Sequence, residues 1–108
     1  MRTDVVLNSL GLRVAAGAVP EEFSGVYAGD FLSRAMSRVE EGDLWITIMN
    51  NVNVIAVASL ADAAAVILAE DVVMDASVLA AAEAKGVTVL LSSKTVFELC
   101  AEIASLMK

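Results

Sequence analysis

Segments typical of buried strands alternate with helical segments along this chain, and that alternation restricts its fold more than any other feature. The clearest example lies between residues 44 and 69. Residues 44–48 are mostly β-branched or aromatic, which predicts a strand, and residues 64–69 predict a second one. Residues 52–61 are compatible with a strand or a helix, but their three alanines and their position between two strands favour a helix. Two buried strands around an apolar helix are typical of a parallel βαβ unit.

The same alternation continues toward both ends of the chain. Asp30 and Asp75 stand at expected helix N-caps, and Gly11 and Gly86 directly follow two expected helices. Residues 21–27 have the composition of a loop. Further helices are predicted over residues 3–10, 31–39, 76–85 and 94–107, and further strands over residues 12–16 and 87–91. We therefore expect one domain over residues 1–108, an α/β protein with a three-layer α/β/α fold and a small, mostly parallel sheet.

The apolar content of the chain exceeds what a small domain buries in one core. Hydrophobic residues make up 58% of the 108 residues. No apolar run approaches the ~20 residues of a membrane-spanning helix, and the first residues do not resemble a signal peptide. The surplus therefore predicts self-association, most simply a twofold homodimer, and no membrane partner. The predicted contact is the segment around residues 51–60, whose helix is apolar nearly all round, with the interface residues Val52, Val54, Ile55, Val57 and Leu60.

Charge and residue types exclude several classes of function. With 14 acidic and 7 basic residues, the net charge is −7 and no basic stripe occurs, which argues against nucleic-acid binding. The absence of histidine removes Ser-His and Cys-His pairs and imidazole metal sites, and no glycine-rich phosphate loop is present. We expect no catalytic residues, no metal and no cofactor. The single cysteine, Cys100, excludes an internal disulfide and fits a structural thiol in the reducing cytoplasm.

Two groups of polar residues are candidates for binding a small ligand. Between residues 25 and 33, two glycines flank an aromatic residue and precede a helix, so backbone amides and a helix dipole are available to an anion. The second group follows the strand at residues 44–48, at the carboxyl end where open α/β sheets bind ligands. Turn formation and capping alone explain both groups, and also residues 92–94, which resemble a phosphate-binding helix start. The candidate ligand residues are Gly25, Tyr27, Gly29, Asp30, Ser33, Thr47, Asn50, Asn51 and Asn53.

Taken together, several of these stretches resemble the DRTGG domain family. The similarity rests on residues 25–33 (GVYAGDFLS), 42–48 (GDLWITI), 53–58 (NVIAVA) and 84–99, and it covers nearly the whole chain. The resemblance implies a fold like the N-terminal domain of HPr kinase and an accessory, dimer-forming or regulatory role. Stand-alone members of the family occur in anaerobes, often beside iron-only hydrogenase genes. The resemblance therefore implies that the protein is an accessory to an anaerobic metabolic or hydrogenase system, and that its protein partner is encoded in the same operon.

The chain departs from the family's polar signature at three places. The family's Gly-Asp is present as Gly29-Asp30, but the Arg that commonly follows is Phe31. The family's Thr-Gly-Gly is replaced by Ala-Glu-Asp at residues 69–71. A His that is common in the single-domain relatives is absent, and its position falls near Asn51 or Val52. The leading hypothesis is a non-catalytic regulatory or protein-interaction domain that forms a homodimer. The alternative is a small-ligand sensor that binds an adenine nucleotide or another anion.

Overall fold

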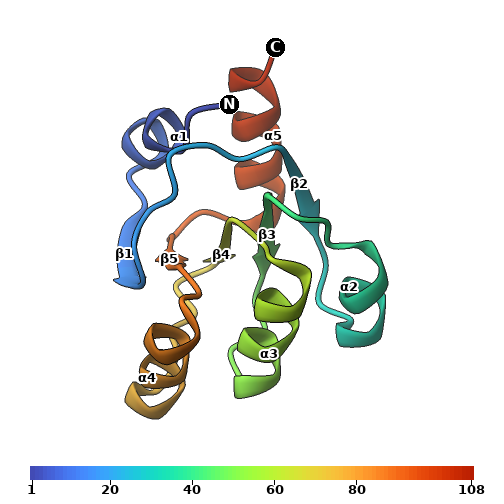
Figure 1. Cartoon of the computed structure of the whole chain (residues 1–108). Coiled ribbons are helices and arrows are strands. Elements are labelled where there is room, and N and C mark those ends of the chain that lie inside the picture. Colours follow the sequence, from blue (N-terminus) through green and yellow to red (C-terminus); the bar gives the residue numbers. More distant parts are fainter.

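A five-stranded sheet forms the middle of the molecule (Figure 1). The computed structural model describes residues 1–108. The strands lie in the spatial order β1-β5-β4-β3-β2; β2 to β5 are parallel, whereas β1 pairs antiparallel with β5 at one edge. The expected small, mostly parallel sheet is thus confirmed. The strands span Arg13–Ala16 (β1), Gly25–Ala28 (β2), Asp43–Thr47 (β3), Ala65–Leu68 (β4) and Val89–Leu91 (β5).

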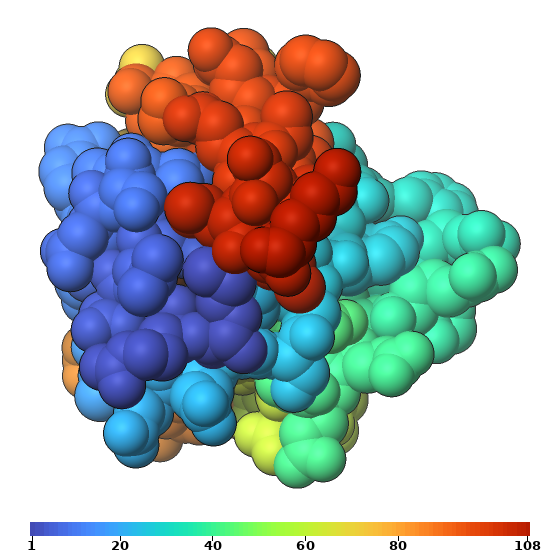
Figure 2. Space-filling view, turned by 90° about the horizontal axis from the view of Figure 1, so that it is seen from above, coloured from blue at the N-terminus to red at the C-terminus, as the bar shows by residue number.

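Helices cover both faces of this sheet and give the three layers expected from the sequence (Figure 1). One face carries α1 (Thr3–Leu10) and α5 (Val96–Leu106), and the other carries α2 (Leu32–Arg38), α3 (Val52–Ala61) and α4 (Ala76–Lys85). Seen from the first face, α1 and α5 lie side by side and the segment around α2 projects beyond them (Figure 2). None of these helices is both long and apolar enough to cross a membrane.

The side chains of the central strand β3 alternate between two hydrophobic cores. Trp45 is fully buried in the core that contains residues of α2, α3 and α4, whereas Leu44 and Ile46 belong to the core that contains residues of α1 and α5. Successive side chains of a strand point to opposite faces, so one apolar strand fills both cores. All four residues of β4 are buried as well. Burial on both faces explains why these strands are continuous apolar runs in the sequence.

Local sequence signals located most elements, but not β2. The helix predicted over residues 52–61 is α3, with the Asn51 side chain capping its start, and α4 ends as predicted at Gly86, whose φ of 68° is left-handed. The loop predicted over residues 21–27 is correct for residues 21–24 but wrong beyond them, because β2 begins at Gly25 and pairs with β3 from Gly25↔Asp43 to Ala28↔Ile46. This four-residue strand lies at the edge of the sheet, so its pairing with β3 defines it more than its composition does.

The structure corrects three of the five predicted interface residues. Val54, Ile55 and Val57 are buried inside the chain, because α3 packs against the sheet and contacts both α2 and α4. They cannot form a surface for a second copy. Of the five predicted interface residues, only Val52 and Leu60 remain accessible, with 51% and 81% of their surface exposed.

Candidate functional site

The carboxyl ends of β2 and β3 bring together several residues of the predicted ligand group. The Asp30 carboxylate, just beyond β2, accepts hydrogen bonds from Thr47 Oγ1 at 2.7 Å and from the Ile48 backbone N–H at 2.8 Å. Thr47 is buried at the end of β3, and its Oγ1 also accepts a hydrogen bond from the Met49 N–H at 3.1 Å. Asp30 therefore fastens the ends of two neighbouring strands to each other.

This position differs from the helix cap predicted for Asp30. The N-cap of α2 is Phe31, which has no side-chain capping bond. Because β2 and β3 are adjacent, the carboxylate reaches across to the buried hydroxyl of Thr47 instead of forward to the amides of α2. The sequence signal for this contact is a polar residue at the end of each strand. Asp30 and Thr47 become neighbours only because β2 and β3 are adjacent in the sheet.

Gly29 packs closely against its neighbours at the end of β2. Its N–H donates to the Ile46 carbonyl and its carbonyl accepts from the Trp45 indole Nε1, both at 3.1 Å. A Cβ atom at this position would lie 2.9 Å from the Tyr27 hydroxyl oxygen, which is too close for a carbon–oxygen contact. The glycine thus lets the chain leave β2 against the Tyr27 side chain and the buried tryptophan.

The asparagines that follow β3 make structural hydrogen bonds. Asn50 donates from Nδ2 to the Val73 carbonyl at 2.8 Å, which ties this loop to the segment between β4 and α4. Asn51 accepts at Oδ1 from the Asn53 N–H at 2.9 Å and caps α3, as the capping interpretation predicts. The Asn53 side chain is exposed, and its backbone alone takes part.

The remaining predicted ligand residues lie elsewhere. Gly25 and Tyr27 line a hollow of about 350 Å³ near the opposite, amino-terminal edge of the sheet, together with residues such as Arg38 and Glu40. Ser33 is exposed on the first turn of α2. The predicted ligand group is therefore divided: Gly29, Asp30, Thr47, Asn50, Asn51 and Asn53 lie at the carboxyl edge, and Gly25 lies in the hollow at the opposite edge. Tyr27 lines that hollow too, but its hydroxyl end lies next to Gly29.

Two acidic residues that we did not select from the sequence also lie at the carboxyl edge. Glu70 and Asp71 follow β4 with left-handed φ angles of 60° and 63°. Their backbone N–H groups donate to the carbonyls of Lys94, at 2.9 Å, and Ser92, at 3.0 Å. Left-handed φ angles of this kind are suited to glycine, yet the chain places two exposed carboxylates on them.

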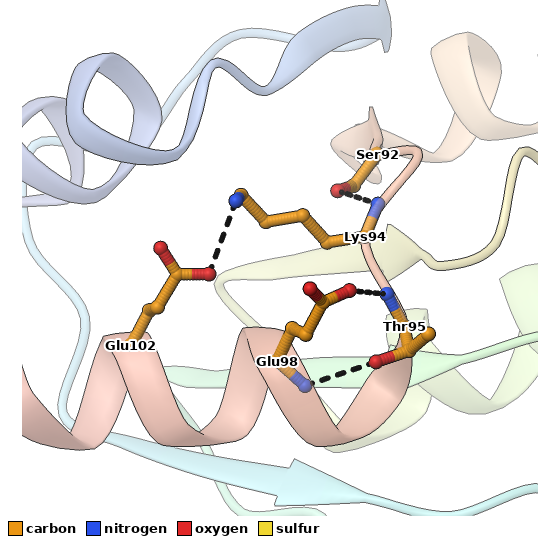
Figure 3. A network of polar contacts seen from close by, with 5 residues as sticks. All are labelled: Ser92, Lys94, Thr95, Glu98 and Glu102. Carbon is orange, nitrogen blue, oxygen red and sulfur yellow. Dashed lines mark hydrogen bonds and ion pairs between the residues drawn. The ribbon is translucent and has the colours of Figure 1, made fainter.

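Hydrogen bonds between the loop before α5 and the first turn of this helix cap its start (Figure 3). Thr95 Oγ1 accepts from the Glu98 N–H at 3.1 Å and Glu98 Oε1 accepts from the Thr95 N–H at 2.9 Å, which is a capping box. The pKa of the Glu98 carboxyl is lowered. The largest cause is its hydrogen bond with the Thr95 backbone, followed by its interaction with the Thr95 side chain. The ammonium of Lys94 pairs with Glu102 at 3.1 Å. Capping thus accounts for this segment, with the chain's own carboxylate at the helix start.

Cys100 is partly buried on α5, and this burial raises the pKa of its thiol. The thiol therefore stays protonated at neutral pH, the form that is a poor nucleophile. No three Asp, Glu or Cys side chains of the chain are grouped closely enough to hold a metal ion.

Comparison with known families and structures identifies the domain. The model of the DRTGG domain matches residues 22–106. The chain belongs to the DRTGG domain family. The match begins before β2, so α1 and β1 lie outside the part of this DRTGG domain that the family model covers. No curated protein is similar to the chain at a significant level.

A solved structure shares the fold of this DRTGG domain. It is the crystal structure of the CBS and DRTGG domains of the regulatory region of Clostridium perfringens pyrophosphatase, complexed with the activator diadenosine tetraphosphate. The TM-score is 0.73 at 14% sequence identity, and the match covers 93% of this chain and 44% of that one. Our chain therefore spans less than half the length of the protein that it matches. At this identity the likeness shows the fold, which agrees with the fold expected from the sequence.

Proposed function

We propose that this DRTGG domain is a non-catalytic regulatory module that acts in the cytoplasm as a homodimer. Its partner would be a protein of the same operon, to which the dimer is an accessory. Three polar residues of the candidate site, Asp30, Asn50 and Asn51, are engaged in hydrogen bonds that hold loops and a helix start in place. A role in architecture accounts for them without a reaction.

The observation that supports the homodimer is the outer stripe of α3. Val52, Ala56 and Leu60 are spaced by four residues and so lie on one face of the helix. No residue of α3 carries a charge, and Val52 and Leu60 are exposed. The small Ala56 between them allows the backbone of a second helix to approach closely. A twofold axis at this stripe would place α3 against α3 of the second copy and cover both exposed side chains.

Light scattering coupled to gel filtration tests this proposal. We expect the wild-type chain to elute at twice the 11.2 kDa mass of one chain at micromolar concentration. Leu60→Asp should give monomers, because a carboxylate would be buried without a partner. Phe97→Asp is the matched control, since Phe97 is 80% exposed but lies on α5, in the opposite layer. A monomeric wild type, or a dimer that survives Leu60→Asp, contradicts the proposal.

A second candidate function is sensing of an adenine nucleotide. The solved relative of this fold was crystallised with an adenine dinucleotide, diadenosine tetraphosphate. In this chain the ligand would meet Gly29 and Asp30 at the carboxyl edge, where open α/β sheets bind ligands, while the buried Thr47 holds Asp30 in place. Thermal unfolding with ATP and with diadenosine tetraphosphate tests it, because a ligand at ~100 times its Kd adds ~2.7 kcal/mol of stability. An unchanged Tm with both nucleotides rejects this function.

A further inference from the structure

Exposed apolar side chains occur in the loops at the carboxyl edge of the sheet, in addition to those on the outer stripe of α3. Ile48 follows β3 and is 40% exposed, Val73 lies between β4 and α4 and is 57% exposed, and Phe31 follows β2 and is 67% exposed. The hydrogen bond from Asn50 to the Val73 carbonyl holds the loops after β3 and β4 next to each other. Apolar side chains gathered on a surface mark places where another molecule binds.

Carboxylates lie on both sides of these apolar residues. Asp30 stands at the end of β2, and Glu70 and Asp71 stand at the end of β4, with Ile48 after the strand between them. Neighbouring strands are about 4.8 Å apart, so the two acidic positions are separated by about 10 Å. None of the three carboxylates belongs to an ion pair, since the ion pairs of the chain are Arg2–Asp4 and Lys94–Glu102.

The cations near this edge do not neutralise it. Lys94, whose carbonyl accepts from the Glu70 N–H, directs its ammonium to Glu102 (Figure 3). Arg13 pairs with Leu91 of β5 at the start of β1, two strands away from β4. Arg34 on α2 makes no ion pair and is a free positive charge. The three carboxylates outnumber it, so the surface over the ends of β2, β3 and β4 is apolar and carries a net negative charge.

The backbone holds these groups in fixed positions before any partner arrives. The turn at Glu70 and Asp71 is fastened by its two bonds to the loop before α5. Asp30 is fixed by its bonds to Thr47 and Ile48 through one carboxylate oxygen, Oδ1. A surface that is already ordered loses little conformational entropy on binding.

We propose that this edge docks a basic amphipathic segment of another protein. Apolar side chains of the segment pack on Ile48 and Val73, and its Lys or Arg side chains meet Asp30 on one side and the Glu70–Asp71 turn on the other. A second copy of this chain would bring two sets of carboxylates together, and the phosphates of a nucleotide would meet the same charge. Charge complementarity therefore favours a cationic partner over both.

A titration of the ¹⁵N-labelled domain with a synthetic amphipathic peptide of lysine and leucine tests the proposal. We expect the peptide to shift the amide signals of Ile48, Asn50, Glu70, Asp71 and Val73. A peptide in which glutamate replaces every lysine should leave them unchanged. The double variant Glu70→Gln/Asp71→Asn should weaken binding about fivefold, because two exposed ion pairs are lost. Val73→Ser should weaken it by a similar factor of about five without any change of charge.

The matched control is the double variant Glu40→Gln/Glu41→Gln, an adjacent exposed pair that precedes β3 at the opposite edge of the sheet. It changes the net charge equally and should alter affinity less than about twofold. Equal weakening by both double variants would reduce the effect to net charge and overturn the proposal. The proposal would also be overturned if the glutamate peptide bound, or if the peptide shifted only amide signals on other surfaces. It would be overturned as well if the amide signals at this edge shifted when the domain was diluted without peptide.

Discussion

The contact between Asp30 and Thr47 allows a sharp test of how the candidate site is held together. In Asp30→Ala, the buried hydroxyl of Thr47 loses its acceptor, and an unsatisfied buried donor costs about 1–3 kcal/mol. The Ile48 N–H loses its acceptor too, but it lies in an exposed residue and water can replace the carboxylate. We expect a loss of about 2 kcal/mol in the free energy of unfolding. Asp30→Asn keeps an oxygen acceptor and should cost about 1 kcal/mol or less.

Urea unfolding monitored by the fluorescence of Trp45, the single tryptophan, measures both variants. With an m-value of about 1.5 kcal/mol/M, the midpoint of Asp30→Ala should fall by about 1.3 M. A double-mutant cycle with Thr47→Val should give a coupling energy of about 1 kcal/mol, because the two side chains share one hydrogen bond. A midpoint of Asp30→Ala within about 0.3 M of wild type, or equal losses in the Ala and Asn variants, would refute the reasoning.

Three further changes test other parts of the fold. Asp62→Gly should raise stability by about 0.5–1 kcal/mol in urea unfolding, because Asp62 ends α3 with a left-handed φ of 56°; a loss of stability would contradict this. Thr3→Val should raise it by about 1 kcal/mol, since Thr3 Oγ1 is buried without a hydrogen-bond partner, whereas Thr3→Ser should bring no gain. Glu98→Gln should flatten the acid limb of stability: the lowered pKa of Glu98 means that its contribution is present above the ordinary value of 4.5 and is lost as the pH falls through the lowered one. Urea midpoints at pH 6 and pH 3 measure this, and equal falls in wild type and variant would disprove it.

The turn after β4 combines an unfavourable backbone conformation with exposed charge. Glu70 and Asp71 both have left-handed φ angles, of 60° and 63°, which favour glycine over residues with a side chain. The turn therefore presents two exposed carboxylates at the carboxyl edge at a cost in conformational energy. These carboxylates are the reason that we place a basic partner at this edge.

The sequence by itself determined the elements whose signals are local. The alanines and the Asn51 cap located α3, and Gly86 located the end of α4, because helix propensity and capping depend on neighbours within one turn. The apolar runs of β3 and β4 indicated strands buried on both faces, and from them a parallel sheet. Asp75 stands at the predicted N-cap of α4, although its side chain makes no capping bond there.

Only the tertiary structure decided which surfaces and contacts these elements present. The sequence of α3 is apolar nearly all round, and its packing between α2, α4 and the sheet determined that Val54, Ile55 and Val57 face inward while Leu60 faces out. The strand order determined that Asp30 reaches Thr47 instead of capping a helix. These outcomes depend on residues far apart in the chain, and a periodic pattern records how often apolar side chains recur but not which neighbour covers them.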